Sequence, residues 1–501
     1  MTDIRFGTDG WRGVIADELT FANVRLVARA IGRRVRAEAG DGAAILVGYD
    51  TRFLSREFAQ AAAESLAHEG LSVALSSRFA PTPAFSYAVV DRRVFGAVVI
   101  TASHNPPEYS GVKFKSSFGG SAPVSFTRAV EEEIRAIRAT SREASASSAE
   151  PPRAVDALHS AFGYPLGVPH SAIESFDPVE PWLNRLEQFV DMARIGASGI
   201  RVILDVMYGS GQGLLAGRLR SAGCEVEELH AEINPAFGGL HPEPIPKYLG
   251  ALMARMREAS GSGLRVGFAF DGDSDRIAPV DETGRLITPH ETLALLLRHL
   301  VRNRKMGGAV VRSVNIGRMV DAEAATLGLP LVVTPIGFKF IAEAMQEHDA
   351  LIGGEESGGF AIRGYIPERD SALIALLLLE CMAMTGKSLG MLVGELERQH
   401  GPHRYGRVDL RLSSLEQRDR VVTGIRTNPP PAITGRRVDG VERMDGVRLD
   451  REDKSWVMLR ASGTEPLLRI YAEAGSEADV ETLLSWGRAL AVETASPNGC
   501  R

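Results

Sequence analysis

The chain has 501 residues, of which 44% are hydrophobic and 24% charged, and its formal net charge is −6. This is the composition of a globular protein, and the slightly acidic balance argues against a nucleic-acid-binding surface. At roughly 100–150 residues per domain, the length predicts about three to five domains.

Cysteine content and apolar runs indicate the compartment. The three cysteines, Cys224, Cys381 and Cys500, are too sparse for a disulfide framework and lack the short spacing of a metal site. The N-terminal MTDIRFGTDGWRG has charge and glycine where a signal peptide needs apolar residues. The most apolar run, 372–379, is far shorter than the about 20 residues that span a bilayer. We therefore expect a cytoplasmic protein with no membrane partner.

The first part of the chain has the pattern of an α/β domain. Apolar, strand-like runs at 43–49, 71–77 and 96–102 are separated by helix-like stretches, which indicates α/β layers with a largely parallel sheet. The small, polar and proline-bearing stretch 139–154 is typical of a linker or an exposed excursion.

The pattern of strand and helix recurs twice, and its character changes from about residue 402. There the runs RYGRVDLRL and SWVMLRASGTEP favour an α+β domain. We therefore expect three similar α/β domains followed by a distinct α+β domain. Their expected bounds are 1–150, 151–283, 284–400 and 401–501.

The loop TASHNP, 101–106, follows the third predicted strand. His104 is next to Ser103, but adjacent side chains rarely face each other, and no G-x-S-x-G elbow marks an acyl-transfer nucleophile. A serine among cations and a metal site is suited instead to carrying a phosphoryl group. Mg²⁺ and lysine would neutralise its charge of about −1.5 to −2.

The loop DGDSDR, 271–276, also follows a predicted strand, RVGFAF. Asp271, Asp273 and Asp275 would repel one another, and a cation that favours oxygen ligands, Mg²⁺ or Ca²⁺ rather than zinc, would relieve the repulsion. The carboxyl end of a strand is also where α/β sheets bind ligands. The alternative is a solvated acidic turn. The loop is not an EF-hand, because the closing glutamate is missing.

Two later loops carry groups suited to a phosphorylated sugar. GGEESGGF, 353–360, offers carboxylates and a hydroxyl that can accept hydrogen bonds from sugar hydroxyls. RASGTEPLLRIY, 460–471, combines guanidinium groups, hydroxyls and backbone N–H groups, a mixture that suits a phosphate dianion. Taken singly, each could also be an ordinary polar turn.

Together and in this order, FGTDGWRG, TASHNP, DGDSDR, GEESGG and RASGTEP resemble the motifs of the α-D-phosphohexomutase family over almost the full length. Known members include phosphoglucomutases, phosphomannomutases and phosphoglucosamine mutases. The resemblance implies an α/β fold of four domains around a central cleft. Three would be similar α/β units with mixed or parallel sheets, and the fourth a smaller α+β C-terminal domain.

The resemblance also implies roles for individual residues. Ser103 would donate and receive the phosphoryl group, and its oxygen would join the three loop aspartates as a ligand of one Mg²⁺. The expected metal ligands are thus Ser103, Asp271, Asp273 and Asp275. The expected substrate-binding residues are Glu355 and Ser357 for the sugar, Lys339, and, for the phosphate that is not reacting, Arg460, Ser462, Gly463, Thr464 and Arg469.

Phosphoryl transfer depends on positioning and on neutralising charge, which Arg12 and Arg276 would assist. Lys113 is the expected general acid/base for the sugar hydroxyl, because a lysine among cations can have a depressed pKa. His104 is the competing candidate. A purely electrostatic role is the alternative for Lys113.

The expected reaction interconverts glucose 1-phosphate and glucose 6-phosphate through a phosphoserine enzyme and a bisphosphorylated sugar. Glucose 1,6-bisphosphate is the expected activator. Within the resembled family, two glutamates before the serine, as before Ser357 here, are typical of glucose-handling members. Phosphoglucosamine mutases and many dual mannose/glucose enzymes often carry a histidine where this chain has Gly359. The resemblance therefore favours glucose over mannose. The alternatives are a phosphomannomutase or dual mannose/glucose mutase, and then a phosphoglucosamine mutase. We expect a monomer or homodimer whose partner is a small phosphosugar, with no nucleic acid.

Two other classes of protein fit the sequence less well than a mutase. A Mg²⁺-dependent sugar phosphatase usually has an aspartate nucleophile in a D-x-D context near its N-terminus, which FGTDGWRG lacks. A catalytically silent sugar-phosphate-binding protein would be expected to lose Ser103 or an aspartate, and none is lost.

Two polar stretches lie outside the motifs. Arg52, in YDTR after the first strand, is expected to help hold the serine loop, or else to be an ordinary turn residue. Asp370 and Ser371 precede the apolar run at 372–379 and are expected to cap that helix, with no further role.

Overall fold

The computed structural model describes residues 3–7, 9–147, 173–259, 263–463 and 465–495. The described chain forms two compact units. The first unit draws on residues 1–288, 345–353 and 357–390, and the second on 289–344, 354–356 and 391–501.

The first sheet of the first unit has the strand order β1-β5-β4-β2-β3-β6. Its strands are β1 (Trp11–Val14), β2 (Ala44–Tyr49), β3 (Ser72–Ser76), β4 (Gly96–Ile100), β5 (Tyr109–Ser116) and β6 (Ile173–Phe176). Strands β2, β3, β4 and β6 run parallel, and β5 is antiparallel to both β1 and β4. The strands expected at 43–49, 71–77 and 96–102 are therefore confirmed.

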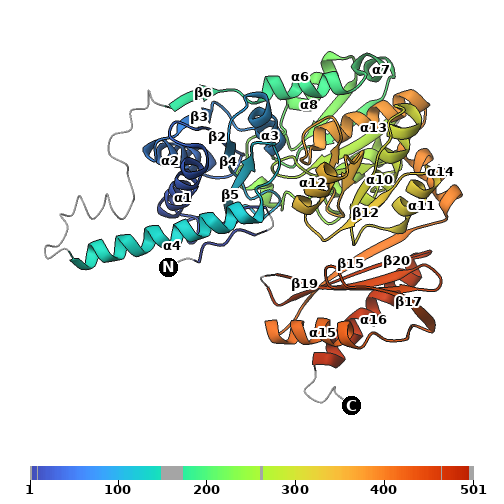
Figure 1. Cartoon of the computed structure of the whole chain (residues 1–501). Coiled ribbons are helices and arrows are strands. Elements are labelled where there is room, and N and C mark those ends of the chain that lie inside the picture. Colours follow the sequence, from blue (N-terminus) through green and yellow to red (C-terminus); the bar gives the residue numbers. More distant parts are fainter. Residues whose placement is uncertain (1–2, 8, 148–172, 260–262, 464, 496–501) are drawn as a thin grey trace. The chain divides into compact units, whose positions relative to one another are not determined.

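Strand β4 shows why these residues form a strand. Its sequence GAVVI is rich in β-branched residues and is buried throughout, because both faces of the sheet are covered. The helices of this part of the unit are α1 (Phe21–Ala39), α2 (Ser55–His68), α3 (Thr82–Asp91) and α4 (Val124–Ser147), seen in blue to cyan in Figure 1.

Two expectations for the linker region need correction. Residues 139–147 continue α4, because Ala, Glu and Arg favour the helix even in this small and polar stretch, and the rest of the expected linker lies outside the described residues. Strand β6 pairs in parallel with β3, so residues 173–176 extend the first sheet, although the sequence placed them in the second domain.

The second sheet of the first unit has the order β10-β9-β7-β8. Its strands are β7 (Arg201–Asp205), β8 (Glu225–Leu229), β9 (Arg265–Phe270) and β10 (Ile277–Val280). Strand β7 is parallel to β8 and β9, whereas β10 returns antiparallel to β9. The acidic loop is therefore the turn between β9 and β10. The helices are α6 (Val179–Phe189), α7 (Met192–Ala197), α8 (Leu214–Ser221), the short η2 (Phe237–Gly239) and α9 (Gly250–Glu258).

Helix α13 (Ser371–Thr385) is a core helix of the first unit, and residues 371–382 are all buried. No single helix in the described residues is long and apolar enough to cross a membrane; the bent pair α13 and α14 (Leu389–His400) meets that test by length and composition. Asp370 caps α13, and its carboxylate accepts hydrogen bonds from the backbone of Ala372 and Leu373, at 3.0 and 3.1 Å.

The second unit begins with α/β structure. Strand β11 (Val310–Ser313) pairs in parallel with β12 (Leu331–Thr334). This unit also contains α10 (Pro289–Arg298), the π-helical turn η3 (His299–Asn303), α11 (Arg318–Thr326) and most of α12 (Phe338–Glu347). Most of β13 (Ile352–Gly354) and all of β14 (Phe360–Ile362) belong to the residues of the first unit.

The C-terminal part of the second unit is an antiparallel sheet with the order β15-β20-β19-β18-β17-β16. The elements are β15 (Arg404–Arg411), α15 (Leu415–Thr427), β16 (Ala432–Ile433), β17 (Arg436–Glu442), β18 (Val447–Arg451), β19 (Trp456–Ala461), β20 (Leu467–Ala474) and α16 (Glu477–Ala495). Figure 1 shows α15 and α16 on one face of this sheet. Alternate residues of β20 fill the core below, while Arg469 and Tyr471 point to the other face.

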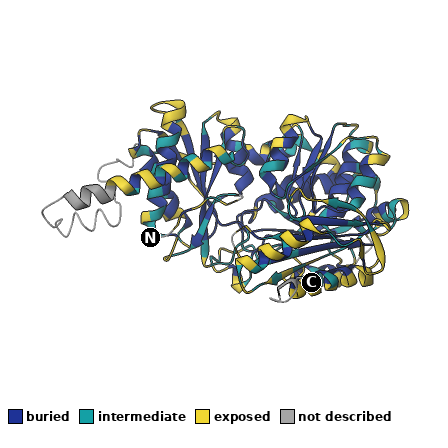
Figure 2. Ribbon diagram, turned by 60° about the horizontal axis from the view of Figure 1, so that its bottom comes forward, coloured by how far each residue is buried: buried dark blue, intermediate teal, exposed yellow. Residues whose placement is uncertain are grey.

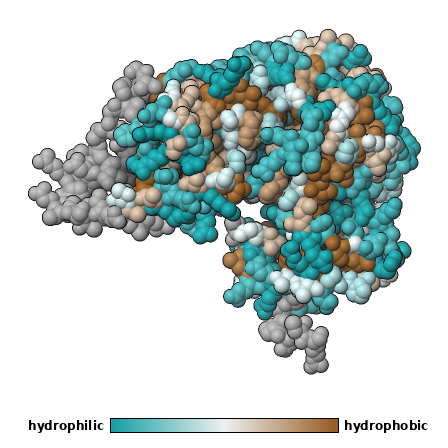
Figure 3. All heavy atoms as spheres, viewed as in Figure 1, coloured by the Kyte–Doolittle hydropathy of each residue, from teal (hydrophilic) through white to brown (hydrophobic). Residues whose placement is uncertain are grey.

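Burial follows the layers. Figure 2 shows the strands largely in dark blue, with exposed residues on outer helix faces and loops. Figure 3 shows hydrophobic side chains interspersed with hydrophilic ones on the visible face. The most exposed large hydrophobic residues, such as Phe53, Ile233 and Val492, come from well-separated parts of the sequence, which is ordinary for a protein surface.

Candidate active site

The loop after β4 holds Ser103 in a strained conformation. Its backbone φ is 54°, in the left-handed region that a serine rarely adopts, and only 1% of the residue is exposed. Its backbone N–H donates to Thr101 Oγ1 at 3.0 Å. Such strain persists only where the surroundings fix the conformation, and it is common at functional sites.

Arg52 provides much of that fixation. Its guanidinium donates to the carbonyl oxygens of Ser103, Asn105, Pro106 and Tyr109 at 2.7, 2.6, 2.8 and 2.8 Å. The expectation that Arg52 holds the serine loop is thus confirmed. Arg52 is itself 3% exposed and pairs with the carboxylate of Asp50 at 3.3 Å.

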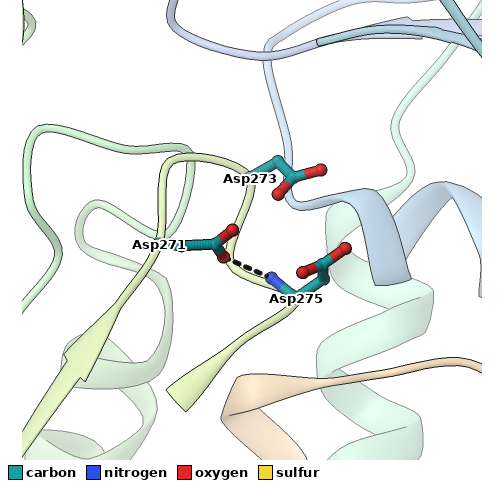
Figure 4. A group of neighbouring side chains, drawn as sticks. All are labelled: Asp271, Asp273 and Asp275. Atoms are coloured by element: carbon teal, nitrogen blue, oxygen red, sulfur yellow. Dashed lines mark hydrogen bonds between the residues drawn. The ribbon is translucent and has the colours of Figure 1, made fainter. Parts of the chain in front are cut away.

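The acidic loop brings Asp271, Asp273 and Asp275 together, as Figure 4 shows. Carboxylate oxygens of the three lie within 4.8 Å of one another, and all three residues are buried. Asp271 Oδ1 accepts from the backbone N–H of Asp275 at 2.9 Å, which closes the turn. Ser103 Oγ donates to Asp271 Oδ2 at 2.8 Å, so the serine loop and the acidic loop meet at these atoms.

The aspartates fit a divalent cation. Oδ1 of Asp273 and Oδ1 of Asp275 are buried and accept no hydrogen bond. Burial, with the neighbouring Asp275 and Asp273, raises the pKa of Asp271 well above its usual range. Clustered carboxylate oxygens that accept no hydrogen bond are the kind of ligand that Mg²⁺ takes.

The second oxygen of Asp273 is held by the protein. Asp273 Oδ2 accepts from Thr82 Oγ1 at 2.6 Å and from Lys113 Nζ at 2.8 Å. Burial alone would raise the pKa of Asp273, but Lys113 and Thr82 outweigh it and lower that pKa. The carboxylate therefore stays charged and fixed in orientation.

Lys113 does not lie in the environment expected for it. Its Nζ is 2.8 Å from both Asp9 and Asp273 and 3.3 Å from Asp275, and 1% of its side chain is exposed. Burial would lower its pKa, but these carboxylates outweigh it and raise the pKa. The expectation of a depressed pKa among cations was wrong, because the neighbours are mainly anions.

His104 is closer to Ser103 than its sequence position suggested. The left-handed conformation of Ser103 brings His104 Nδ1 to 3.3 Å from Ser103 Oγ, so the two adjacent side chains do face each other. Burial, followed by the cations Arg276 and Arg12, lowers the pKa of His104 well below its usual range, so the ring is neutral near pH 7.

The two expected arginines lie beside these loops. Arg12 donates to Asn105 Oδ1 at 2.6 Å. Arg276 is held by the turn itself, through a hydrogen bond from its backbone N–H to Asp271 Oδ1 at 3.1 Å, and its Nε is 3.8 Å from Asp275 Oδ1. The first unit therefore brings together all the residues expected to be catalytic or to bind the metal.

The loop 353–360, which was expected to bind the sugar, is fixed at its end by Gly358. Its carbonyl accepts from the backbone N–H of Ile277, the first residue after Arg276, at 3.0 Å. A Cβ at Gly358 would lie 2.6 Å from the Ile277 carbonyl oxygen, and φ is 86°, so only glycine fits. Ser357 thus lies beside the exit of the acidic loop, while Glu355, 6% exposed, is described with the second unit.

The phosphate-type loop lies at the ends of β19 and β20. Arg460 and Arg469 are directly opposite each other on these strands, an arrangement of like charges that an anion would stabilise. Arg460 Nε donates to Asp445 Oδ1 at 2.9 Å, and Arg469 Nε is 3.8 Å from Asp409 Oδ2. Arg418 donates to the carbonyl of Ser462 and so holds the turn.

The other residues expected in the second unit differ in how they are placed. Gly463 is in the turn after β19, and Thr464 lies outside the described residues. Lys339 is near the start of α12, with its Nζ 4.9 Å from the centre of the Phe340 ring. Its expected contact with substrate stays a prediction.

Sequence reasoning missed a group of buried charges around the serine and acidic loops. Asp9 contacts Lys113 and Arg369 at 2.8 Å each, and Lys115 pairs with Glu368 at 2.5 Å. Asp9 lies in FGTDGWRG, which was quoted for the resemblance, but only Arg12 of that motif was given a role. Glu368 and Arg369 directly precede the expected helix cap, and no motif marked them.

Comparison with known protein families gives a match in four parts. Family descriptions for phosphoglucomutase/phosphomannomutase match three alpha/beta/alpha domains, I, II and III, at residues 3–141, 180–284 and 288–400. The C-terminal domain of the same family matches residues 423–485.

Individual relatives resemble the chain over nearly its whole length. A phosphoglucomutase/phosphomannomutase of Thermococcus kodakarensis is 29% identical, over 96% of this chain and 97% of its own. A phosphoglucosamine mutase of Synechococcus elongatus is 31% identical, over 95% and 91%. The crystal structure of a Thermus thermophilus protein assigned as a phosphomannomutase has 35% identity and a TM-score of 0.80, with 98% and 99% covered.

The chain therefore belongs to the phosphoglucomutase/phosphomannomutase family, and the resemblance to phosphohexomutases is confirmed. The expected fold class is confirmed in its domains, three α/β and one C-terminal. The central cleft stays a prediction. The relatives carry different sugar names, so the family match supports a phosphohexomutase without selecting glucose.

Proposed function

We propose that this protein moves a phosphoryl group between the 1- and 6-hydroxyls of a hexose phosphate, with Ser103 as the carrier. The observation that supports this most is the contact between Ser103 Oγ and Asp271 Oδ2, at 2.8 Å, in a loop strained around Ser103. It gives a buried serine a place beside the three carboxylates that fit a divalent cation.

Ser103, Asp271, Asp273 and Asp275 would hold one Mg²⁺. When bound, Mg²⁺ would supply positive charge beside the phosphoserine oxygens. In each half-reaction a sugar hydroxyl oxygen bonds to phosphorus as the bond from phosphorus to Ser103 Oγ breaks, or the reverse. The proton lost by the attacking hydroxyl passes to a base, and the leaving oxygen gains one.

The base would be Lys113 or His104. His104 Nδ1 is 3.3 Å from Ser103 Oγ, whereas Lys113 is held by carboxylates, which suits a role in fixing Asp273. Arg12 and Arg276 would stabilise charge on the transferred group. Glu355, Ser357 and Lys339 would bind the sugar, and Arg460, Ser462, Gly463, Thr464 and Arg469 the other phosphate.

Glucose phosphate is the substrate that the sequence favours, because two glutamates precede Ser357. Phosphoglucosamine mutase and phosphomannomutase are second candidates of equal standing. Phosphoglucosamine mutase is favoured by the Synechococcus relative, and phosphomannomutase by the Thermus structure. Glucose 1,6-bisphosphate would activate the enzyme by phosphorylating Ser103.

We also propose domain limits near residues 150, 283 and 400. The exception is β6 (Ile173–Phe176), which lies beyond the first limit but belongs to the first sheet. A cytoplasmic location and a monomer or homodimer remain predictions.

A coupled assay tests the function. The chain would receive the 1-phosphate of glucose, mannose or glucosamine, with Mg²⁺ and a trace of the matching 1,6-bisphosphate. We expect the 6-phosphate to form, fastest for glucose. A preference for glucosamine or mannose would keep the mutase and replace the sugar. Release of inorganic phosphate in place of the 6-phosphate would indicate a phosphatase, and no conversion of any sugar would overturn the proposal.

A further inference from the structure

Arg369 joins the three α/β domains at the acidic loop. It belongs to the part of the chain matched by domain III, and it is 4% exposed. One nitrogen of its guanidinium is 2.7 Å from Asp275 Oδ2, in the part matched by domain II. The same nitrogen is 2.8 Å from Asp9 Oδ2, in the part matched by domain I.

These contacts divide the oxygens of the acidic loop into two sets. Oδ2 of Asp275 is held by Arg369, and Oδ2 of Asp273 by Lys113 and Thr82. Oδ1 of Asp273 and Oδ1 of Asp275 are buried and accept no hydrogen bond. A carboxylate that is held through one oxygen presents the other in a fixed direction, and groups that hold a ligand in this way commonly set metal affinity.

The neighbouring residues show that this segment is built into the loop. Ser371 Oγ donates to the carbonyl of Ser274 at 2.7 Å, between two of the aspartates. Glu368 pairs with Lys115 at 2.5 Å, and both side chains are fully buried. Residues 368–371 therefore contact the serine domain and the acidic loop as one continuous stretch, beyond their role at the start of α13.

The guanidinium group at position 369 has a shape that suits these contacts. A guanidinium is planar and offers several donors, so it can bridge two carboxylates while remaining charged. A lysine at this position would bring a single ammonium group in place of the planar set of donors. A methionine would leave the carboxylates of Asp9 and Asp275 with one cation fewer beside them. Breaking a buried charge pair costs more than the pair contributes, because the remaining charge is uncompensated.

We propose that Arg369 is a positioning residue that orients Asp275 toward the metal and thereby makes metal affinity depend on docking of residues 368–371. The inference rests on the metal site of the proposed function and not on turnover of any sugar. Arg369 acts through Asp275 and is not itself expected to touch the cation.

The test is a titration of the full-length chain with Mg²⁺ or Mn²⁺ alone, followed by calorimetry, for wild type, Arg369→Met and Arg369→Lys. We expect the Kd of either metal to rise roughly 10- to 100-fold in Arg369→Met, the usual effect of losing a residue that orients a ligand. The rise should be smaller in Arg369→Lys. Arg363→Met is the matched control, because Arg363 pairs at 2.9 Å with Asp349, which lies outside the acidic loop.

A second readout separates positioning from general stability. Binding of a metal raises Tm by an amount that depends on its Kd. A merely structural Arg369 would lower Tm with and without Mn²⁺ and leave the increment unchanged, whereas a positioning role reduces the increment. If Arg369→Met does not fold, Arg369→Lys decides: a smaller Tm increment than in wild type supports positioning, and an unchanged increment contradicts it.

The outcomes are distinct. Folded variants that bind Mn²⁺ within twofold of wild type, with an unchanged Tm increment, would overturn this inference alone. A wild-type chain that binds neither metal would overturn it together with the proposed metal site. A chain that binds metal and shows the Arg369 effect, yet converts no sugar phosphate, would support the inference and contradict the proposed function.

Discussion

The serine and acidic loops of the first unit and the phosphate-type loop of the second unit differ in how their charged side chains are buried and paired. Around the serine and acidic loops of the first unit, carboxylates and cations are buried and paired at short distance, as between Lys113 and Asp273 at 2.8 Å. At the phosphate-type loop of the second unit, the side chain of Arg469 is 31% exposed, and its Nε is 3.8 Å from Asp409 Oδ2.

Under the proposed function, the difference follows from how long each charge stays in the site. A phosphoserine and a cation that remain through the reaction need a fixed, desolvated environment, because preorganised charges act most strongly there. A phosphate that arrives with each substrate needs cations that are accessible and only loosely engaged beforehand. The comparison therefore predicts that substitutions in the first region affect the chemical step, and those in the second affect substrate binding.

The largest effect is expected for Ser103→Ala. Without the oxygen that carries the phosphoryl group, kcat should fall by at least about a thousandfold, the order seen when a nucleophile is removed. The coupled assay measures this directly. Ser485→Ala, which removes an exposed hydroxyl of α16 that donates to Glu481, should keep full activity. A Ser103→Ala variant with more than a tenth of wild-type turnover would contradict the phosphoserine role.

Arg52→Met should have the next largest effect. It removes the hydrogen bonds to the carbonyls of the serine loop, so Ser103 would lose its strained conformation. We expect kcat to fall about 100-fold with little change in KM, because a small misplacement of a reacting group has a cost of this order. Arg92→Met is the control, since Arg92 pairs with Glu174, away from the loop. A change confined to KM would show that Arg52 acts on binding.

Arg469→Gln should act on binding instead. Loss of one charged hydrogen bond to phosphate is worth about 1.5–3 kcal/mol, so KM should rise at least about tenfold while kcat changes less. Arg437→Gln, at an exposed arginine of the same sheet paired with Glu452, should leave both constants unchanged. If Arg469→Gln lowered kcat and left KM intact, the contrast between the two regions would be wrong.

The smallest effect is expected at Asp370, in thermal stability. Asp370 Oδ2 accepts from Trp182 Nε1 at 2.8 Å and from Tyr365 at 2.9 Å, and an amide nitrogen there would face two donors. Asp370→Asn should therefore lose about 1–2 kcal/mol of stability.

That loss should depend on pH. Burial raises the pKa of Asp370 to about 6. Because the folded state then binds a proton more tightly than the unfolded state, the aspartate contributes more stability below pH 6 than above it. The gap in Tm between wild type and Asp370→Asn should widen as the pH falls from about 7 to about 5. A gap that narrows over this range would contradict the raised pKa.

Much of the fold and the site could be predicted, because the signals are local. Buried β-branched runs predicted β2, β3 and β4, and the carboxyl ends of strands predicted where Ser103 and the aspartates would lie. The prediction failed where contacts join distant positions. Arg369 and Asp9 are separated by 360 residues, and no local pattern marks their hydrogen bond. The depressed pKa expected for Lys113 failed for the same reason, since its carboxylate partners come from other segments.

Some features depend on backbone conformation, which composition does not reveal. The contact between His104 and Ser103 exists because Ser103 has a φ of 54°. Similarly, residues 139–147 are helical although their composition is typical of a linker. In the first case the surrounding structure fixes a strained backbone. In the second, the helix preference of Ala, Glu and Arg outweighs the linker-like composition.

The most direct test of the central claim is to follow a phosphoryl group on Ser103. The chain would be incubated with Mg²⁺ and a 1,6-bisphosphorylated hexose, and the peptide containing Ser103 examined by mass spectrometry before and after a chase with the matching hexose monophosphate. We predict one added phosphoryl group on Ser103 that the chase transfers to the sugar. An unmodified Ser103 in a chain that still interconverts the two monophosphates would contradict the account.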